Sequence, residues 1–158
     1  MHGVELARAL HVVAVVIWIG GAAMATSVIL PAIRQGDLGN DRLKAFHAIE
    51  RRFIWQARAA VLVVGITGFY MVARLDLLAW FSSAKFWWMH AMVGVWVLFM
   101  VLLFVVEPLV LHRYFRGWAT AQPKLAFDWL QGAHWLLVSL SLITIFGAVA
   151  GSRGWSLF

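Results

Sequence analysis

Long apolar stretches alternate with short charged clusters along the chain. No Asp, Glu, Lys or Arg lies between Arg8 and Arg34, from 86 to 106 or from 129 to 152. A helix that crosses a bilayer needs about 20 mostly apolar residues, and each of these stretches is that long. The pattern therefore predicts an all-α protein, an integral membrane four-helix bundle that forms a single transmembrane domain over residues 1–158. We expect its spans at about 4–30, 53–73, 85–110 and 125–151.

The segment before the second span has a different pattern. Its apolar residues Leu43, Phe46 and Ile49 recur at helical spacing between charged residues, and Asp41 is suited to cap a helix that starts there. We therefore expect a short amphipathic helix at the membrane surface before the second span. Pro108, near the end of the third span, predicts a kink or an end in that helix.

Composition agrees with a membrane protein. Hydrophobic residues make up 63% of the chain, against about half in a typical soluble domain. The net charge is +6, but the basic residues lie beside apolar spans, so anionic lipid is the expected partner and nucleic acid is not. Because there is no cysteine, disulfides, thiolate ligands, iron–sulfur clusters and cysteine-linked haem are excluded.

The basic residues also predict an orientation. Nine lie on the face shared by the first and third loops, and four lie on the face with both termini and the second loop. We therefore expect, by the positive-inside rule, a multi-pass protein of the cell inner (plasma) membrane with both termini outside, which is the periplasm if the protein is bacterial. The first group is Arg34, Arg42, Lys44, Arg51, Arg52, Arg58, Arg113, Arg116 and Lys124, and the second is Arg8, Arg74, Lys85 and Arg153.

Two histidines lie at matched depth near the outer face. His11 is in the first span and His90 in the third, and ionisable residues in lipid usually mark function. Imidazoles on facing helices are the usual axial ligands of a b-type haem, so we expect both to bind haem iron. Gly94, one turn from His90, leaves room for a flat macrocycle. The alternative is that each histidine only bonds across helices. Other residues of this layer are Gly65, Gly68 and Gly147, and the cations suited to haem propionates are Arg8, Arg74 and Lys85.

A second polar group lies toward the inner face. We expect Arg58 and Glu107 to form an ion pair, because each charge alone at that depth costs a few kcal/mol. The group is suited to a second haem, a quinone pocket, a proton path or only a network between helices. Its members are His47, His112, His134, Arg51, Arg58 and Glu107.

Four short motifs resemble known families. Leu10-His11-Val12-Val13 with Trp18-Ile19-Gly20-Gly21 resembles the first helix of the copper-resistance D (CopD) family and of the HemJ-type protoporphyrinogen oxidases, which are small four-helix membrane proteins. Glu50-Arg51-Arg52 and Trp88-Met89-His90-Ala91 are similar to HemJ patterns.

The resemblance implies different functions for the same layer. A HemJ-like protein binds haem, and its essential histidine corresponds to His11. Its essential lysine, two residues after the histidine of span three, is replaced here by Met92. A CopD-like protein handles copper, and His11, Met71, His90 and Met92 offer the soft ligands that suit Cu(I).

The leading hypothesis is a membrane-embedded b-type haem protein with one or two haem b groups. Its role would be electron transfer or a quinone-linked redox reaction, as a membrane oxidoreductase or a cytochrome b-like subunit. The alternatives are CopD-like copper transport or handling, a HemJ-like protoporphyrinogen IX oxidase, and an accessory subunit. The expected partners are the lipid bilayer, a quinone or respiratory-chain protein, and further copies of the chain in a homo-oligomer.

Overall fold

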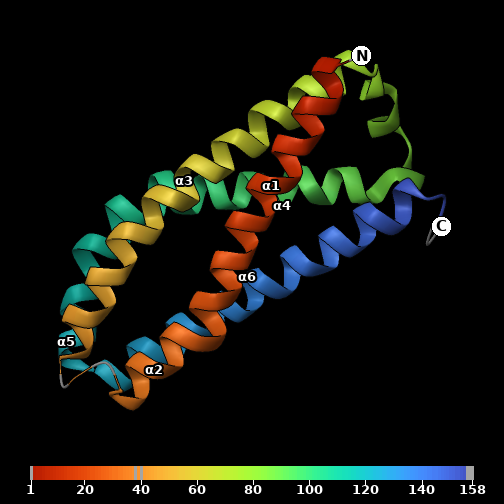
Figure 1. Cartoon of the computed structure of the whole chain (residues 1–158). Coiled ribbons are helices and arrows are strands. Elements are labelled where there is room, and N and C mark those ends of the chain that lie inside the picture. Colours follow the sequence, from red (N-terminus) through yellow and green to blue (C-terminus); the bar gives the residue numbers. More distant parts are fainter. Residues whose placement is uncertain (1, 38, 40, 156–158) are drawn as a thin grey trace.

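The computed structural model describes residues 2–37, 39 and 41–155, apart from the side chains of Arg42, residues 110–113 and Arg116. All the regular elements in this part of the chain are helices (Figure 1). In chain order they are α1 (His2–Met24), η1 (Ala25–Ile29), α2 (Leu30–Gln35), α3 (Arg42–Arg74), η2 (Leu77–Ser82), η3 (Ala84–Phe86), α4 (Trp87–Val101), η4 (Leu102–Phe115), α5 (Arg116–Ala121) and α6 (Pro123–Ser152).

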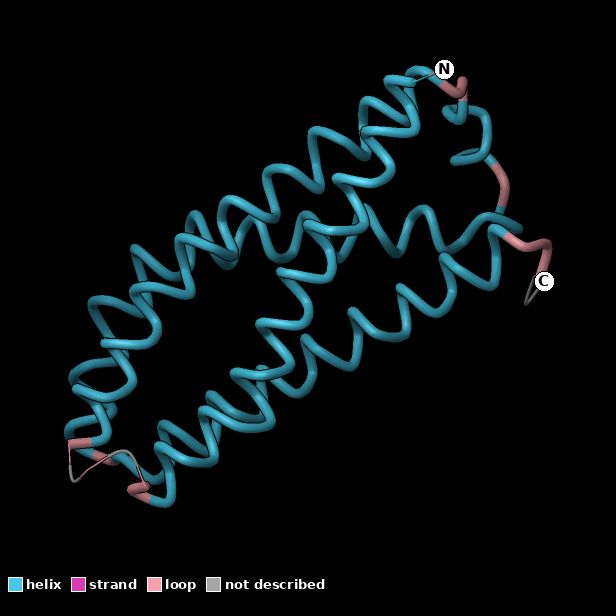
Figure 2. The backbone as a smooth tube through the Cα atoms, viewed as in Figure 1, coloured by secondary structure: helices cyan, strands magenta, loops and turns pink. Residues whose placement is uncertain are grey.

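Four helical stretches are long and apolar enough to cross a membrane. Their number and order agree with the predicted spans. Figures 1 and 2 show the start of α1, the end of α6 and the α3–α4 connection at one end of the molecule, with α2 and α5 at the other. The two groups of connections that define the charge asymmetry therefore lie at opposite ends. The four stretches are His2–Gln35, Leu43–Arg74, Ala84–Leu109 and Pro123–Ser152.

The segment before the second span is helical, but it is not a separate helix. It begins at Asp41, whose carboxylate accepts a hydrogen bond from the Lys44 amide at 2.9 Å. The cap is therefore as predicted. From there α3 runs to Arg74 without interruption, because residues 42–64 include no glycine or proline. The prediction of a distinct surface helix is wrong in this respect.

Two segments are π-helical, and each precedes or includes a proline. η1 ends just before Pro31, and η4 includes Pro108. A proline inside a helix removes one amide donor and crowds the carbonyl four residues earlier. Widening the helix to bonds five residues apart relieves the crowding, as in the bond from the Leu30 amide to the Ala25 carbonyl. The third long helix thus does not end at Pro108, although Figure 1 shows the chain bending between α4 and α5.

The widening leaves one carbonyl without a backbone donor in each segment. The residue five positions after Thr26 is Pro31, and the residue five positions after Leu103 is Pro108. Side chains from other helices bond both carbonyls. Gln131 Nε2 donates to the Thr26 oxygen at 3.4 Å, and Arg58 donates to the Leu103 oxygen at 3.0 and 2.8 Å.

The core consists of two hydrophobic clusters at different heights. The first joins α1, α3 and α4 around Trp18, Val61 and Phe99. The second joins α2, the start of α3, α5 and α6 around Ile33 and Phe127. α1 packs mainly along α3, and α4 packs along α6. Both clusters and both π-helical segments contribute residues to the wall of the partly open cavity described below.

Candidate functional site

His11 is held against α3 by a directed hydrogen bond. Its Nδ1 lies 3.0 Å from Thr67 Oγ1, and the Thr67 hydroxyl donates to the Val63 carbonyl at 2.6 Å. Since the hydroxyl proton is engaged there, Nδ1–H of His11 donates to the hydroxyl oxygen, and the lone pair of the neutral ring lies on Nε2. A Cβ at Gly68 would lie 3.3 Å from the ring, so that glycine permits the close approach.

His90 has a different environment. Its side chain is exposed, and its Nε2 donates to the Phe81 carbonyl in η2 at 2.9 Å. The Phe81 ring also meets it edge to face, with centroids 5.4 Å apart. The structure therefore turns His11 toward α3 and His90 toward the α3–α4 connection. No hydrogen bond joins the two imidazoles in the described part of the chain.

Four glycines were predicted to lie in the same layer as His11 and His90. Three of them are packed against side chains of the protein itself. The indole of Trp96 occupies the space beside Gly65, and that of Trp87 occupies the space beside Gly147. Gly68 receives His11 as described above. Gly94 is the exception, because a Cβ there would meet no atom within 4 Å. Gly94 and His90 are both exposed on α4, so this face of the helix is open.

The predicted cations of the outer layer lie at the surface. Arg8, Arg74 and Lys85 are all exposed. Arg74 places its guanidinium 6.0 Å from the centre of the Tyr70 ring, a cation–π contact. Arg8 and Lys85 have no ion pair among the described residues.

The predicted ion pair of the inner group is confirmed. Arg58 Nη2 lies 2.7 Å from Glu107 Oε2, and each side chain keeps 19% of its exposure. The guanidinium also lies 5.5 Å from the centre of the Trp55 ring and 5.4 Å from that of Phe104. Together with the bonds to the Leu103 carbonyl, these contacts explain Arg58 as the side chain that stabilises the widened η4 helix.

The other members of the inner group are dispersed. His47 Nδ1 lies 3.1 Å from Glu50 Oε2 on the same helix. Arg51 is exposed and does not join this pair, and the side chain of His112 lies outside the described residues. His134 Nδ1 donates to the Leu130 carbonyl at 2.9 Å, so Nε2 of the neutral ring is the acceptor. No group of three or more His, Cys, Asp or Glu among the described residues is arranged to hold a metal ion.

A partly open cavity of about 220 Å³ is lined by residues of both core clusters. Its wall is almost entirely apolar, and the exceptions include His134, Glu50 and Glu107. Trp18 also lines it, is only 4% exposed, and has no described partner that accepts a hydrogen bond from its Nε1. A buried N–H without a partner costs about 1–3 kcal/mol, so this donor is a marked exception to the usual rule.

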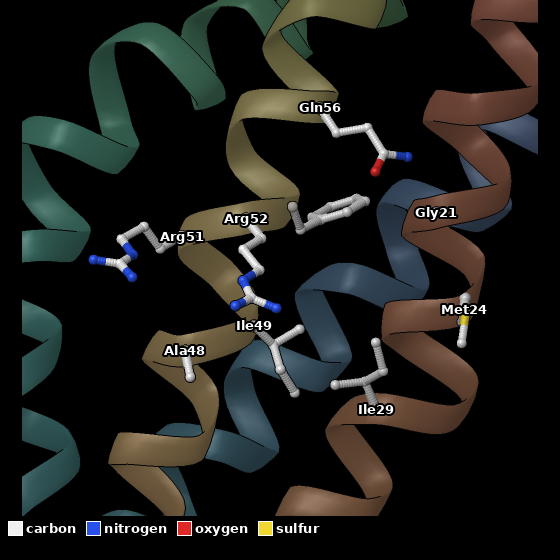
Figure 3. Close-up of a pocket in the computed structure, with 9 residues that line it drawn as sticks. Gly21, Met24, Ile29, Ala48, Ile49, Arg51, Arg52 and Gln56 are labelled. Carbon is white, nitrogen blue, oxygen red and sulfur yellow. The ribbon is translucent and has the colours of Figure 1, made fainter.

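A groove of about 530 Å³ lies beside this cavity, between α3 and the α1–η1 helix (Figure 3). Ile29, Ile49 and Phe53 line both spaces. Phe53 leans on Gly21, where a Cβ would lie 2.5 Å from the ring. Figure 3 shows Arg52 extending over the groove, while Arg51 points away from α1.

Sequence reasoning missed Thr67, Trp18 and Phe53. Thr67 had a usable signal, because a hydroxyl in an otherwise apolar stretch at the depth of His11 invites a hydrogen bond. Trp18 and Phe53 had none, since an aromatic residue in an apolar span is ordinary. No family model, curated protein or solved structure matches this chain.

Proposed function

We propose that the chain is a membrane-embedded bundle of four helices. The outward side chains support this proposal. Leu136 is 71% exposed, Ile66 is 70% exposed and Val16 is 65% exposed, although each lies inside a long apolar helix. Soluble monomers rarely expose large contiguous apolar surfaces, whereas lipid solvates such a surface without cost. We propose the cell inner membrane with both termini outside, and the distribution of basic residues supports this orientation.

Within this bundle, we propose that the protein is a b-type haem protein that transfers electrons. The observation that carries the proposal is the bond from His11 to Thr67. Histidines that bind a metal usually donate the other ring N–H to a fixed acceptor, which sets the tautomer and the ring orientation. Here Nδ1–H is directed to Thr67, so Nε2 is the nitrogen left to bind iron.

Of the two predicted ligands, His11 is the one whose hydrogen bonding leaves Nε2 available to hold haem iron. His90 would be the second ligand only after releasing the Phe81 carbonyl, or through Nδ1, because Nε2–H is engaged. The open face at His90 and Gly94 offers room for a macrocycle, and the nearby surface cations Arg8, Arg74 and Lys85 would hold its propionates. When bound, haem would supply one-electron chemistry at a potential set by its ligands and surroundings.

The test is the absorption spectrum of the purified protein, oxidised and reduced, in four forms. Native protein should show a Soret band and sharp reduced α and β bands. His11→Ala should lose the haem. His134→Ala is the matched control, because it also removes an imidazole from a long apolar helix, and it should keep the haem. His90→Ala should retain haem in a five-coordinate, high-spin form if His90 is the second ligand.

Two results would overturn the proposal. One is a folded native protein, produced with ample haem, that shows no haem absorption. The other is a His11→Ala variant with the full haem content of the native protein. A low-spin spectrum in His90→Ala would reject His90 alone and direct the search to another second ligand.

A further inference from the structure

The groove between α3 and the α1–η1 helix combines an uncompensated cation with a mostly apolar lining (Figure 3). Arg52 extends over the groove, is exposed, and has no ion pair among the described residues. No described Asp or Glu lines the groove, and Ile29, Ile49 and Phe53 supply much of its surface. The groove therefore suits an occupant that carries a negative charge next to an apolar segment.

Gln56 adds a neutral polar group to the same groove. It is exposed, lines the groove and points toward α1 in Figure 3. Residues four apart lie on the same face of a helix, and the rise of α3 places Gln56 about 6 Å beyond Arg52 along the helix axis. Because α3 starts at the basic first loop, the cation lies nearer the inner face and the amide lies deeper.

Exposed apolar side chains continue along both helices from the deep end of the groove. On α1, Ile17 lies one turn beyond Gly21, and on α3, Val63 lies two turns beyond Gln56. Helical spacing places each on the same face of its helix as the groove residue, and both are exposed. Since α1 packs along α3, an apolar chain that leaves the groove toward the outer face would lie on apolar side chains.

The chemical groups along this path follow the order of the groups in a glycerophospholipid. A cation comes first and suits a phosphate, an amide N–H comes next and suits an ester carbonyl, and apolar side chains follow and suit an acyl chain. The ammonium of a zwitterionic headgroup would find no described carboxylate in the groove, whereas an anionic headgroup needs none. Basic pockets of this kind at the inner side of a membrane bind anionic lipids.

We propose that this groove binds one anionic glycerophospholipid. Arg52 pairs with its phosphate, the Gln56 amide donates to an ester carbonyl, and one acyl chain lies along α1 and α3. The site rests on the proposed membrane-embedded bundle, but it uses none of the residues assigned to haem.

The experiment is native mass spectrometry of the full chain, released from detergent micelles, during titration with dioleoylphosphatidylglycerol or zwitterionic dioleoylphosphatidylcholine. Native protein should bind its first anionic lipid about five- to tenfold more tightly than the zwitterionic one. Arg52→Gln should lower phosphatidylglycerol affinity about three- to tenfold and remove most of this preference. Lys44→Gln is the matched control, because it removes an exposed cation of α3 that does not line the groove, and it should keep the preference.

Two further measurements test the rest of the assignment. Gln56→Leu should weaken both lipids about two- to fivefold and leave their ratio unchanged, because both lipids have ester carbonyls. Glycerol 1-phosphate at constant ionic strength should not displace bound phosphatidylglycerol, because the headgroup alone lacks the acyl chain that the apolar surface binds.

Three results would overturn the proposal. They are equal affinities of native protein for the two lipids, an equal loss of phosphatidylglycerol affinity in Arg52→Gln and Lys44→Gln, and displacement of the lipid by glycerol 1-phosphate. Extraction of cell membranes with alkaline carbonate separates these results from failure of the proposed function. A chain that leaves the membrane in carbonate would reject the membrane-embedded bundle, whereas a chain that stays and shows no lipid preference would reject this site only.

Discussion

At the scale of single residues, a hydroxyl fixes the orientation of His11. Thr67→Val keeps the shape of the side chain but removes the acceptor for Nδ1–H. Loss of such a partner typically lowers metal affinity about 10–100-fold, so we expect a decrease of that size in haem affinity, measured by titration of the haem-free protein. Thr144→Val is the matched control, because Thr144 makes the same kind of bond to its own helix without contacting a histidine. Equal affinities of native protein and Thr67→Val would contradict the role given to Thr67.

Arg58 is the second residue with a specific energetic role. Arg58→Met removes the partner of Glu107 and both donors to the Leu103 carbonyl. Removal of one partner from a buried pair costs about 3–5 kcal/mol, and we expect the lower value because the pair keeps some exposure. Unfolding in detergent measures the loss. The double variant Arg58→Met/Glu107→Gln should recover part of it, and a double variant that is less stable than Arg58→Met would refute the pairing argument.

At the scale of elements, the two wide helices share one cause. A proline leaves a carbonyl without its backbone donor, and another helix supplies a side chain to bond it. The bond therefore joins two helices at a point where one of them is distorted. Both widened segments contribute residues to the wall of the cavity.

Pro108 and Arg58 should therefore be energetically coupled. Pro108→Ala restores an amide that bonds the carbonyl of Leu103 or Phe104. The cost of Arg58→Met should therefore be about 1–3 kcal/mol smaller in the Pro108→Ala background than in the native background, since the Leu103 carbonyl no longer depends on Arg58. A double-mutant cycle of unfolding free energies measures the difference. Additive effects would show that the proline and the arginine act separately.

At the scale of the whole molecule, both termini and the α3–α4 connection share one end. Because the chain has no cysteine, single cysteines report sidedness without a background. We expect Ser82→Cys to react with an impermeant maleimide added to intact cells or spheroplasts. Asp37→Cys should react only after the membrane is opened, because nine of the basic residues lie on its side. The reverse pattern would show that the charge distribution does not set the orientation here.

The sequence alone determined the helical class and the four long apolar stretches. It also determined which connections lie at the same end of the molecule. These depend on local composition and on charge counts, which need no knowledge of neighbours in space. It also identified the Asp41 cap and the Arg58–Glu107 pair. Capping is local to one turn of helix, and two opposite charges at the same depth have few other ways to avoid the cost of burial.

Only the tertiary structure decided which groups meet. Depth placed His11 and His90 in one layer, but rotation of each helix about its axis directs His11 to Thr67 and His90 to Phe81. The cavity beside Trp18 likewise depends on how two separate clusters pack. Helix rotation and packing depend on contacts among residues far apart in the chain, and an apolar span with no strong polar face leaves them undetermined.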